Sequence, residues 1–106
     1  MSNISQTAIE TLQAQRIGKR LFNHWKHKFE VTEHPTGFEI LMPQARIQLL
    51  CTENHLQVMI QALDTSVDMV RLEQVVLDHL IRMAQEPLHA EWQHSKASTP
   101  VELLKP

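Results

Sequence analysis

The residues best suited to chemistry are histidines at helical spacing in two predicted helices. His24 and His27 are three positions apart, so one helix can present both imidazoles to a single ion. His79 follows Leu72 and Val76 on or beside the apolar side of a second predicted helix. If the two helices pack side by side, His79 meets His24 or His27, and imidazole nitrogens suit iron or zinc. The alternative is that each histidine makes only an ordinary hydrogen bond at a helix border.

Charged residues extend this candidate site. Glu73 or Asp78 can supply an oxygen ligand or orient a histidine. No acidic residue lies between Glu10 and Glu30. This basic segment could bind an anion, a nucleic-acid backbone or an acidic partner. Alternatively, it is simply a helix face in contact with solvent. The net charge of −2 and the lack of interleaved aromatic residues disfavour nucleic acid. Five of the ten Lys and Arg residues lie in this segment: Arg16, Lys19, Arg20, Lys26 and Lys28.

Other classes of site find less support. The only cysteine, Cys51, falls on the inward side of a predicted strand and is expected to be an inert core thiol, and the lack of an internal disulfide favours the cytoplasm. With only Gly18 and Gly37, the chain has no glycine-rich phosphate-binding motif. No apolar run approaches the roughly 18 residues of a membrane span, and no secretory signal is visible. The sequence therefore favours a cytoplasmic binding protein over an enzyme.

The apolar pattern predicts the elements that position these residues. Leu12 to Lys28 follows a helical period, and Gly18 within it marks a place where another element can approach closely. Residues 29–63 alternate with period two between turn residues, which predicts four strands of an antiparallel meander. Three possible caps at 64–66 begin a second helix that ends near Gln85, before Pro87.

These elements predict an α+β fold in the order (β)-α-β-β-β-β-α-β. A short strand at 7–11 is the optional first element, and residues 88–93 form the last strand. Two amphipathic helices on one face of a four- to five-stranded, mainly antiparallel sheet would bury every apolar side. The last strand is expected to pair with the first strand of the meander. Residues 1–93 form the single domain, and residues 94–106 form a tail that is flexible or docked.

The other face of the predicted sheet offers an alternative function. Leu41, Leu50, Met59 and Leu63 point away from the helices. A contiguous exposed apolar patch usually marks an interface. This pattern favours a protein–protein interaction or homodimerisation module that binds no ligand.

Two segments in combination resemble the bacterial domain-of-unknown-function family 2218. The first is His24-Trp25-Lys26-His27-Lys28-Phe29, at the end of the first helix. The second runs from Arg71-Leu72-Glu73 to His79-Leu80-Ile81-Arg82, with Trp92 about a strand later. The likeness covers most of the chain. The sequence departs from the family at two positions: family members usually have an aromatic residue in place of Met83, and often one in place of Ile17.

The resemblance implies iron handling without implying an activity. Members of this family are often neighbours of, or fused to, siderophore-uptake and siderophore-interacting proteins. The resemblance therefore implies an iron siderophore as ligand and siderophore-interacting proteins as candidate partners. The family-typical positions that this chain retains are His24, His27, Lys28, Arg71, Glu73, His79 and Trp92.

These observations predict a non-catalytic domain that binds an anionic small molecule or a metal chelate at the two helix faces. His24, His27 and His79 would hold iron or zinc or donate hydrogen bonds, although nothing in the sequence demands a metal. Lys28 and Arg71 would supply positive charge. Glu73 would orient a histidine or Arg71, and Trp92 would complete the ligand-binding set.

Overall fold

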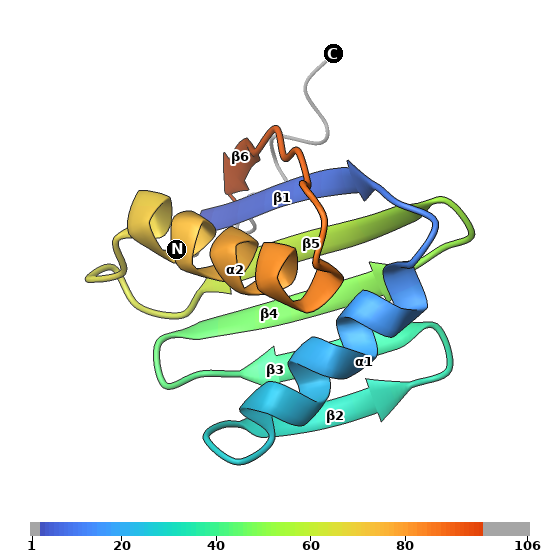
Figure 1. Ribbon diagram of the computed structural model, residues 1–106. Coiled ribbons are helices and arrows are strands. Elements are labelled where there is room, and N and C mark those ends of the chain that lie inside the picture. Colours follow the sequence, from blue (N-terminus) through green and yellow to red (C-terminus); the bar gives the residue numbers. More distant parts are fainter. Residues whose placement is uncertain (1–2, 97–106) are drawn as a thin grey trace.

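Six antiparallel strands form one sheet in the computed structural model, and both helices cover the same face of it (Figure 1). The structure describes residues 3–96. The strand order across the sheet is β2-β3-β4-β5-β1-β6. In chain order the elements are β1 (Asn3–Glu10), α1 (Ala14–Trp25), β2 (Glu30–His34), β3 (Gly37–Leu41), β4 (Ala45–Cys51), β5 (His55–Ala62), α2 (Met69–Ala84) and β6 (Gln93–Lys96).

The predicted fold class is confirmed, including the optional strand at the front of the chain. That strand is β1, and it pairs along its length with β5. Two predictions about the end of the sheet were wrong. Residues 88–92 form no strand, and β6 pairs with β1 and not with β2. The reason is that β1 occupies the free edge of β5, so the chain returning from α2 reaches β1 first. The sheet thus continues past the predicted domain end at residue 93 as far as Lys96, and the rest of the predicted tail lies outside the described residues.

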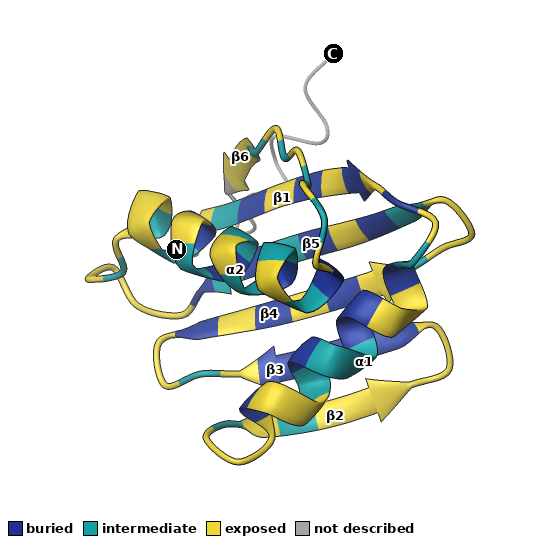
Figure 2. Ribbon diagram, viewed as in Figure 1, coloured by how far each residue is buried: buried dark blue, intermediate teal, exposed yellow. Residues whose placement is uncertain are grey.

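The core lies between the sheet and the helices. Alternate strand residues face inward, which Figure 2 shows as buried segments that alternate with exposed ones along the strands. Ile40, Ile47 and Ile60 form one fully buried row in register across β3, β4 and β5. Leu21 of α1 and Leu80 of α2 belong to the same core cluster. Burying each such side chain stabilises the fold by about 1.5–3 kcal/mol relative to leaving it exposed.

The two helices begin later than the sequence pattern predicts, for local reasons. Leu12 is 84% exposed and precedes α1, while the hydroxyl of Thr11 accepts a hydrogen bond from the backbone N–H of Gln13. The predicted caps at 64–66 lie in the loop before α2. Asp68 caps α2 instead, because its carboxylate accepts the backbone N–H of Arg71 at 3.2 Å.

Gly18 marks a close approach of α1 to the sheet, as the sequence predicted. A Cβ atom at this position would lie 2.8 Å from two ring carbons of Phe38 and 3.2 Å from the sulfur of Cys51. Phe38 is buried, so its ring has little room to move away. The absence of a side chain at residue 18 therefore lets α1 settle onto β3 and β4.

We predict that Gly18→Ala destabilises the protein although alanine is the better helix former. Overpacking against Phe38 costs about 1–3 kcal/mol, and the gain in helix propensity offsets about 1 kcal/mol of it. A net loss of about 1–2 kcal/mol is expected in the free energy of unfolding by denaturant. Asn23→Ala on the exposed side of α1 is the control and is expected to stabilise slightly. Equal stabilisation by both substitutions would contradict the packing argument.

Candidate functional site

The two helices bring His24 and His79 together beside a buried tryptophan. The imidazole of His24, in the last turn of α1, lies 5.6 Å from that of His79 between ring centroids. The ring of Trp25 lies 5.0 Å from His79 and meets Phe29 edge-on at 5.8 Å. The amino group of Lys28 lies 5.6 Å from the centre of the Phe29 ring. These five side chains form a continuous band along one side of the α1–α2 contact, called the aromatic band below.

The backbone of α2 fixes the protonation pattern of the His79 ring. The Nδ1 atom lies 2.7 Å from the carbonyl oxygen of Val75. A carbonyl oxygen only accepts hydrogen bonds, so Nδ1 carries a proton. In the neutral ring the lone pair is therefore on Nε2. That nitrogen can accept a hydrogen bond or bind a metal, while Nδ1 holds the ring in place.

A groove of about 550 Å³ lies next to the aromatic band. Its lining is mainly apolar and comes from the turn after α1, the turn before β4, the loop before α2 and the first half of α2. Arg71 and Asp68 are its charged lining residues, and within the described part of the chain no carboxylate pairs with the Arg71 guanidinium. The lining residues used below are Phe29, Asp68, Arg71, Leu72 and Val75. We call this cavity the helix groove.

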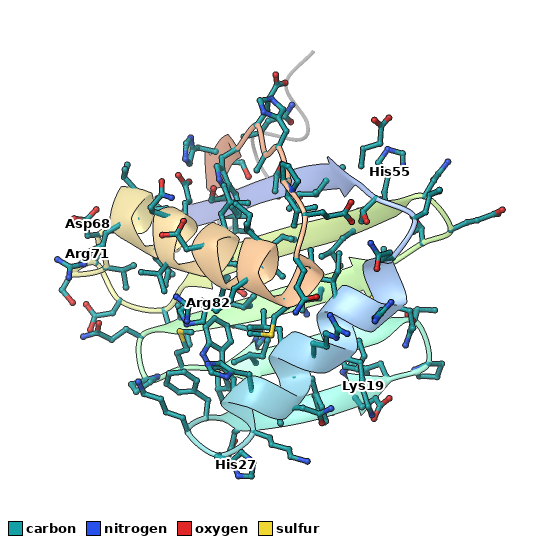
Figure 3. The ribbon with its side chains drawn as sticks, in the orientation of Figure 1. Lys19, His27, His55, Asp68, Arg71 and Arg82 are labelled. Carbon is teal, nitrogen blue, oxygen red and sulfur yellow. The ribbon has the colours of Figure 1, made fainter. Side chains whose placement is uncertain are left out.

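His27 does not join the other two imidazoles. It lies in the turn after α1 and is exposed, and Figure 3 shows it pointing away from α2. Within residues 3–96, no three histidine, cysteine, aspartate or glutamate side chains are grouped so as to hold a metal ion. The structure thus pairs two of the three predicted metal ligands. Any metal bound here would need further ligands from elsewhere.

Glu73 lies on a different side of α2 and faces the sheet. Its buried carboxylate accepts a hydrogen bond from the hydroxyl of Ser5, which is fully buried in β1. The same carboxylate oxygen, Oε2, lies 2.5 Å from Nε2 of His94 in β6. Glu73 therefore contacts a histidine, but this is His94 and not one of the histidines of the predicted ligand site. We call these three residues the buried carboxylate cluster.

The order of groups in the buried carboxylate cluster excludes a serine-hydrolase arrangement. In such a site the imidazole stands between the serine and the acid and takes the proton of the hydroxyl. Here Glu73 stands between Ser5 and His94, and Ser5 has no exposed surface. The cluster instead satisfies a buried carboxylate and links α2 to β1 and β6.

Trp92 and His94 depart from their predicted roles. Trp92 is half-buried against the core in the segment before β6, and it lines neither the helix groove nor the aromatic band. His94 begins the segment predicted to be a tail, yet it lies in β6 and contacts Glu73. The sequence carried one usable signal: Ser5, Thr7 and Ile9 alternate on the inward side of β1, so a polar residue there needed a partner.

Cys51 fits the predicted inert core thiol. Its sulfur lies 3.5 Å from the carbonyl oxygen of Ala14 and packs near Gly18. Burial raises the pKa of the Cys51 thiol. A raised pKa lowers the fraction of thiolate, so the environment does not activate this residue as a nucleophile.

We predict that Ser5 and Glu73 are energetically coupled. Ser5→Ala removes one donor from a buried carboxylate, which is expected to cost about 1–3 kcal/mol of unfolding free energy. In a Glu73→Leu background the same substitution is expected to cost much less. Ser95→Ala, at an exposed position of β6, is the matched control and should have little effect. Additive effects of Ser5→Ala and Glu73→Leu would contradict this account.

The comparisons place the chain among proteins of similar sequence and fold. No helix among the described residues is long and apolar enough to cross a membrane. No curated protein matches the chain significantly. The NMR structure of PA4090 from Pseudomonas aeruginosa is similar, with 33% sequence identity and a TM-score of 0.70 over 85% of this chain and 94% of that one. Residues 6–93 match the family described as uncharacterized protein conserved in bacteria (DUF2218), and the chain belongs to that family.

Proposed function

We propose that this protein is a non-catalytic binding domain that takes an anionic small molecule with an apolar or aromatic body in the helix groove. The observation that carries this proposal is an apolar groove of about 550 Å³ with Arg71 in its lining, whose guanidinium pairs with no carboxylate among residues 3–96. Ligand sites are typically concave and apolar, with a few polar groups that fix orientation. Phe29, Leu72 and Val75 would contact the body of the ligand, and Arg71 would bind its anionic group.

The charges around the helix groove favour an anion over a cation. Lys28 reaches the Phe29 ring at one end of the groove, and Arg71 lies in the first turn of α2. The one carboxylate in the lining, Asp68, already accepts the backbone N–H of Arg71. A planar guanidinium binds a carboxylate through two parallel hydrogen bonds, which gives direction as well as attraction.

His24 and His79 support a chelated metal more than a free ion. Two neighbouring imidazoles supply fewer ligands than the four that zinc takes in a structural site or the six of octahedral iron. A metal held here would therefore arrive with donors of its own, as in an anionic chelate. The free Nε2 of His79 would bind that metal or donate to the chelate when protonated.

A ferric siderophore is a ligand of this description. On this proposal the protein acts in iron handling, and a siderophore-interacting protein is the partner that would deliver or receive the chelate. This part of the proposal comes from the family resemblance. The support from geometry concerns only the shape, charge and donor atoms of the helix groove and aromatic band.

Salicylate and its ferric bis-complex are suitable probes, because both are aromatic anions and one carries iron. We predict saturable chemical-shift changes at Phe29, Arg71 and Val75 when salicylate is titrated, and saturable paramagnetic broadening of the same signals when the ferric complex is titrated. Arg71→Gln is expected to weaken binding about tenfold or more, because a charged hydrogen bond contributes about 1.5–3 kcal/mol. Arg82→Gln is the matched control, an exposed arginine of the same helix outside the groove lining; both residues are labelled in Figure 3.

Substitution of the two histidines is expected to distinguish binding of the ferric complex from binding of salicylate alone. His24→Ala/His79→Ala is expected to weaken binding of the ferric complex while leaving binding of salicylate alone nearly unchanged. Zinc and ferric salts without the chelator are expected to leave the melting temperature unchanged. Binding that Arg71→Gln does not weaken would contradict the proposed function. So would changes in the NMR signals that are confined to residues outside the helix groove.

A further inference from the structure

The outer face of the sheet is a second surface, remote from the helix groove. Both helices lie on the inner face, and within residues 3–96 no element covers the outer one (Figure 1). Outward side chains from successive strands are in register. One row crosses from Glu39 through Gln48, Met59 and Gln6 to Gln93. A hollow of about 490 Å³ lies over this row.

Among residues 3–96, the middle of this face carries no charged side chain, although charged residues make up 21% of the chain and Glu91 lines one side of the hollow. The neighbouring outward row of Leu50, Gln57 and Ala8 is likewise uncharged. Glu39 lies toward one side of the face and is neutralised within it, because its carboxylate pairs with Arg46 at 3.3 Å. Protein interfaces are distinguished by charge depletion at their centre and by enrichment in methionine. Leu50 is 40% exposed beside this centre.

These features fit a second copy of the same chain better than a charged partner. Each glutamine amide both donates and accepts hydrogen bonds, so a glutamine-rich face complements itself across a two-fold axis. The face has no unpaired central charge to repel its copy. The helix side, by contrast, exposes Arg16, Lys26 and Lys28 and would repel another copy of itself.

The size of the face is compatible with a dimer. Six strands at about 4.8 Å spacing, each roughly 20 Å long, give about 580 Å² in projection. This projection exceeds the roughly 500 Å² per partner, or about 1,000 Å² in total, that a specific interface is expected to bury. We infer that the outer face of the sheet is the interface of a homodimer in which two sheets pack face to face.

Light scattering after size-exclusion chromatography over a concentration series tests this inference on the full chain. The expected mass is twice that of the chain. Leu50→Glu is expected to shift the dissociation constant upward by about a hundredfold or more, because it places like charges across a dry interface. Leu12→Glu makes the same change at an 84% exposed leucine outside this face and should leave the dimer intact. A circular dichroism melt of both variants confirms that they fold.

Three results would overturn the inference. The first is a monomeric mass for the folded wild-type chain at every concentration. The second is a dimer that survives both Leu50→Glu and Gln48→Glu, which would place the interface elsewhere. The third is a monomer in which amide shifts at Leu50 and Gln48 respond to removal of residues 97–106, which would assign the face to that segment.

Discussion

Removal of the inner face of the sheet from water is the constraint on which the rest of the structure depends. Its central rows are branched aliphatic side chains, and Ile40, Ile47 and Ile60 have no exposed surface. Hairpin connections within the meander run at the ends of the strands and cannot cover this face. The two helices must therefore lie side by side across it. Their contact line, and with it the meeting of His24 with His79, follows from that requirement.

The geometry of α2 divides the predicted ligand set between two neighbourhoods. Residues eight apart on a helix differ by about 80° around its axis, so Arg71 and His79 face similar directions. Residues six apart differ by about 240°, which turns Glu73 away from His79 and toward β1. Positions that the sequence suggested as one site thus serve two purposes. Arg71 lines the helix groove, His79 belongs to the aromatic band beside it, and Glu73 is satisfied inside the fold.

This division could have been predicted from the sequence, whereas the partner of Glu73 could not. The angle between positions 73 and 79 around the helix axis follows as soon as the segment is predicted to be helical. The contact with His94 depends on where β6 joins the sheet, and β6 pairs with β1 only because β1 already lies against β5. Local patterns found both helices and the strands up to Ala62, the close approach at Gly18 and the two sheet faces, but misplaced the last strand. Strand order depends on competition between edges that are distant in the chain, and no local pattern encodes it.

A single helix layer on a sheet leaves two surfaces with different chemistry. The helix side carries a basic helix whose exposed Arg16, Lys26 and Lys28 favour anions, and the groove beside it is apolar. The opposite side is uncharged at its centre and rich in amides that complement themselves. Because the whole thickness of the sheet separates the two, occupation of one need not obstruct the other. A face-to-face dimer would present two helix grooves pointing outward, so each copy would keep access to its ligand.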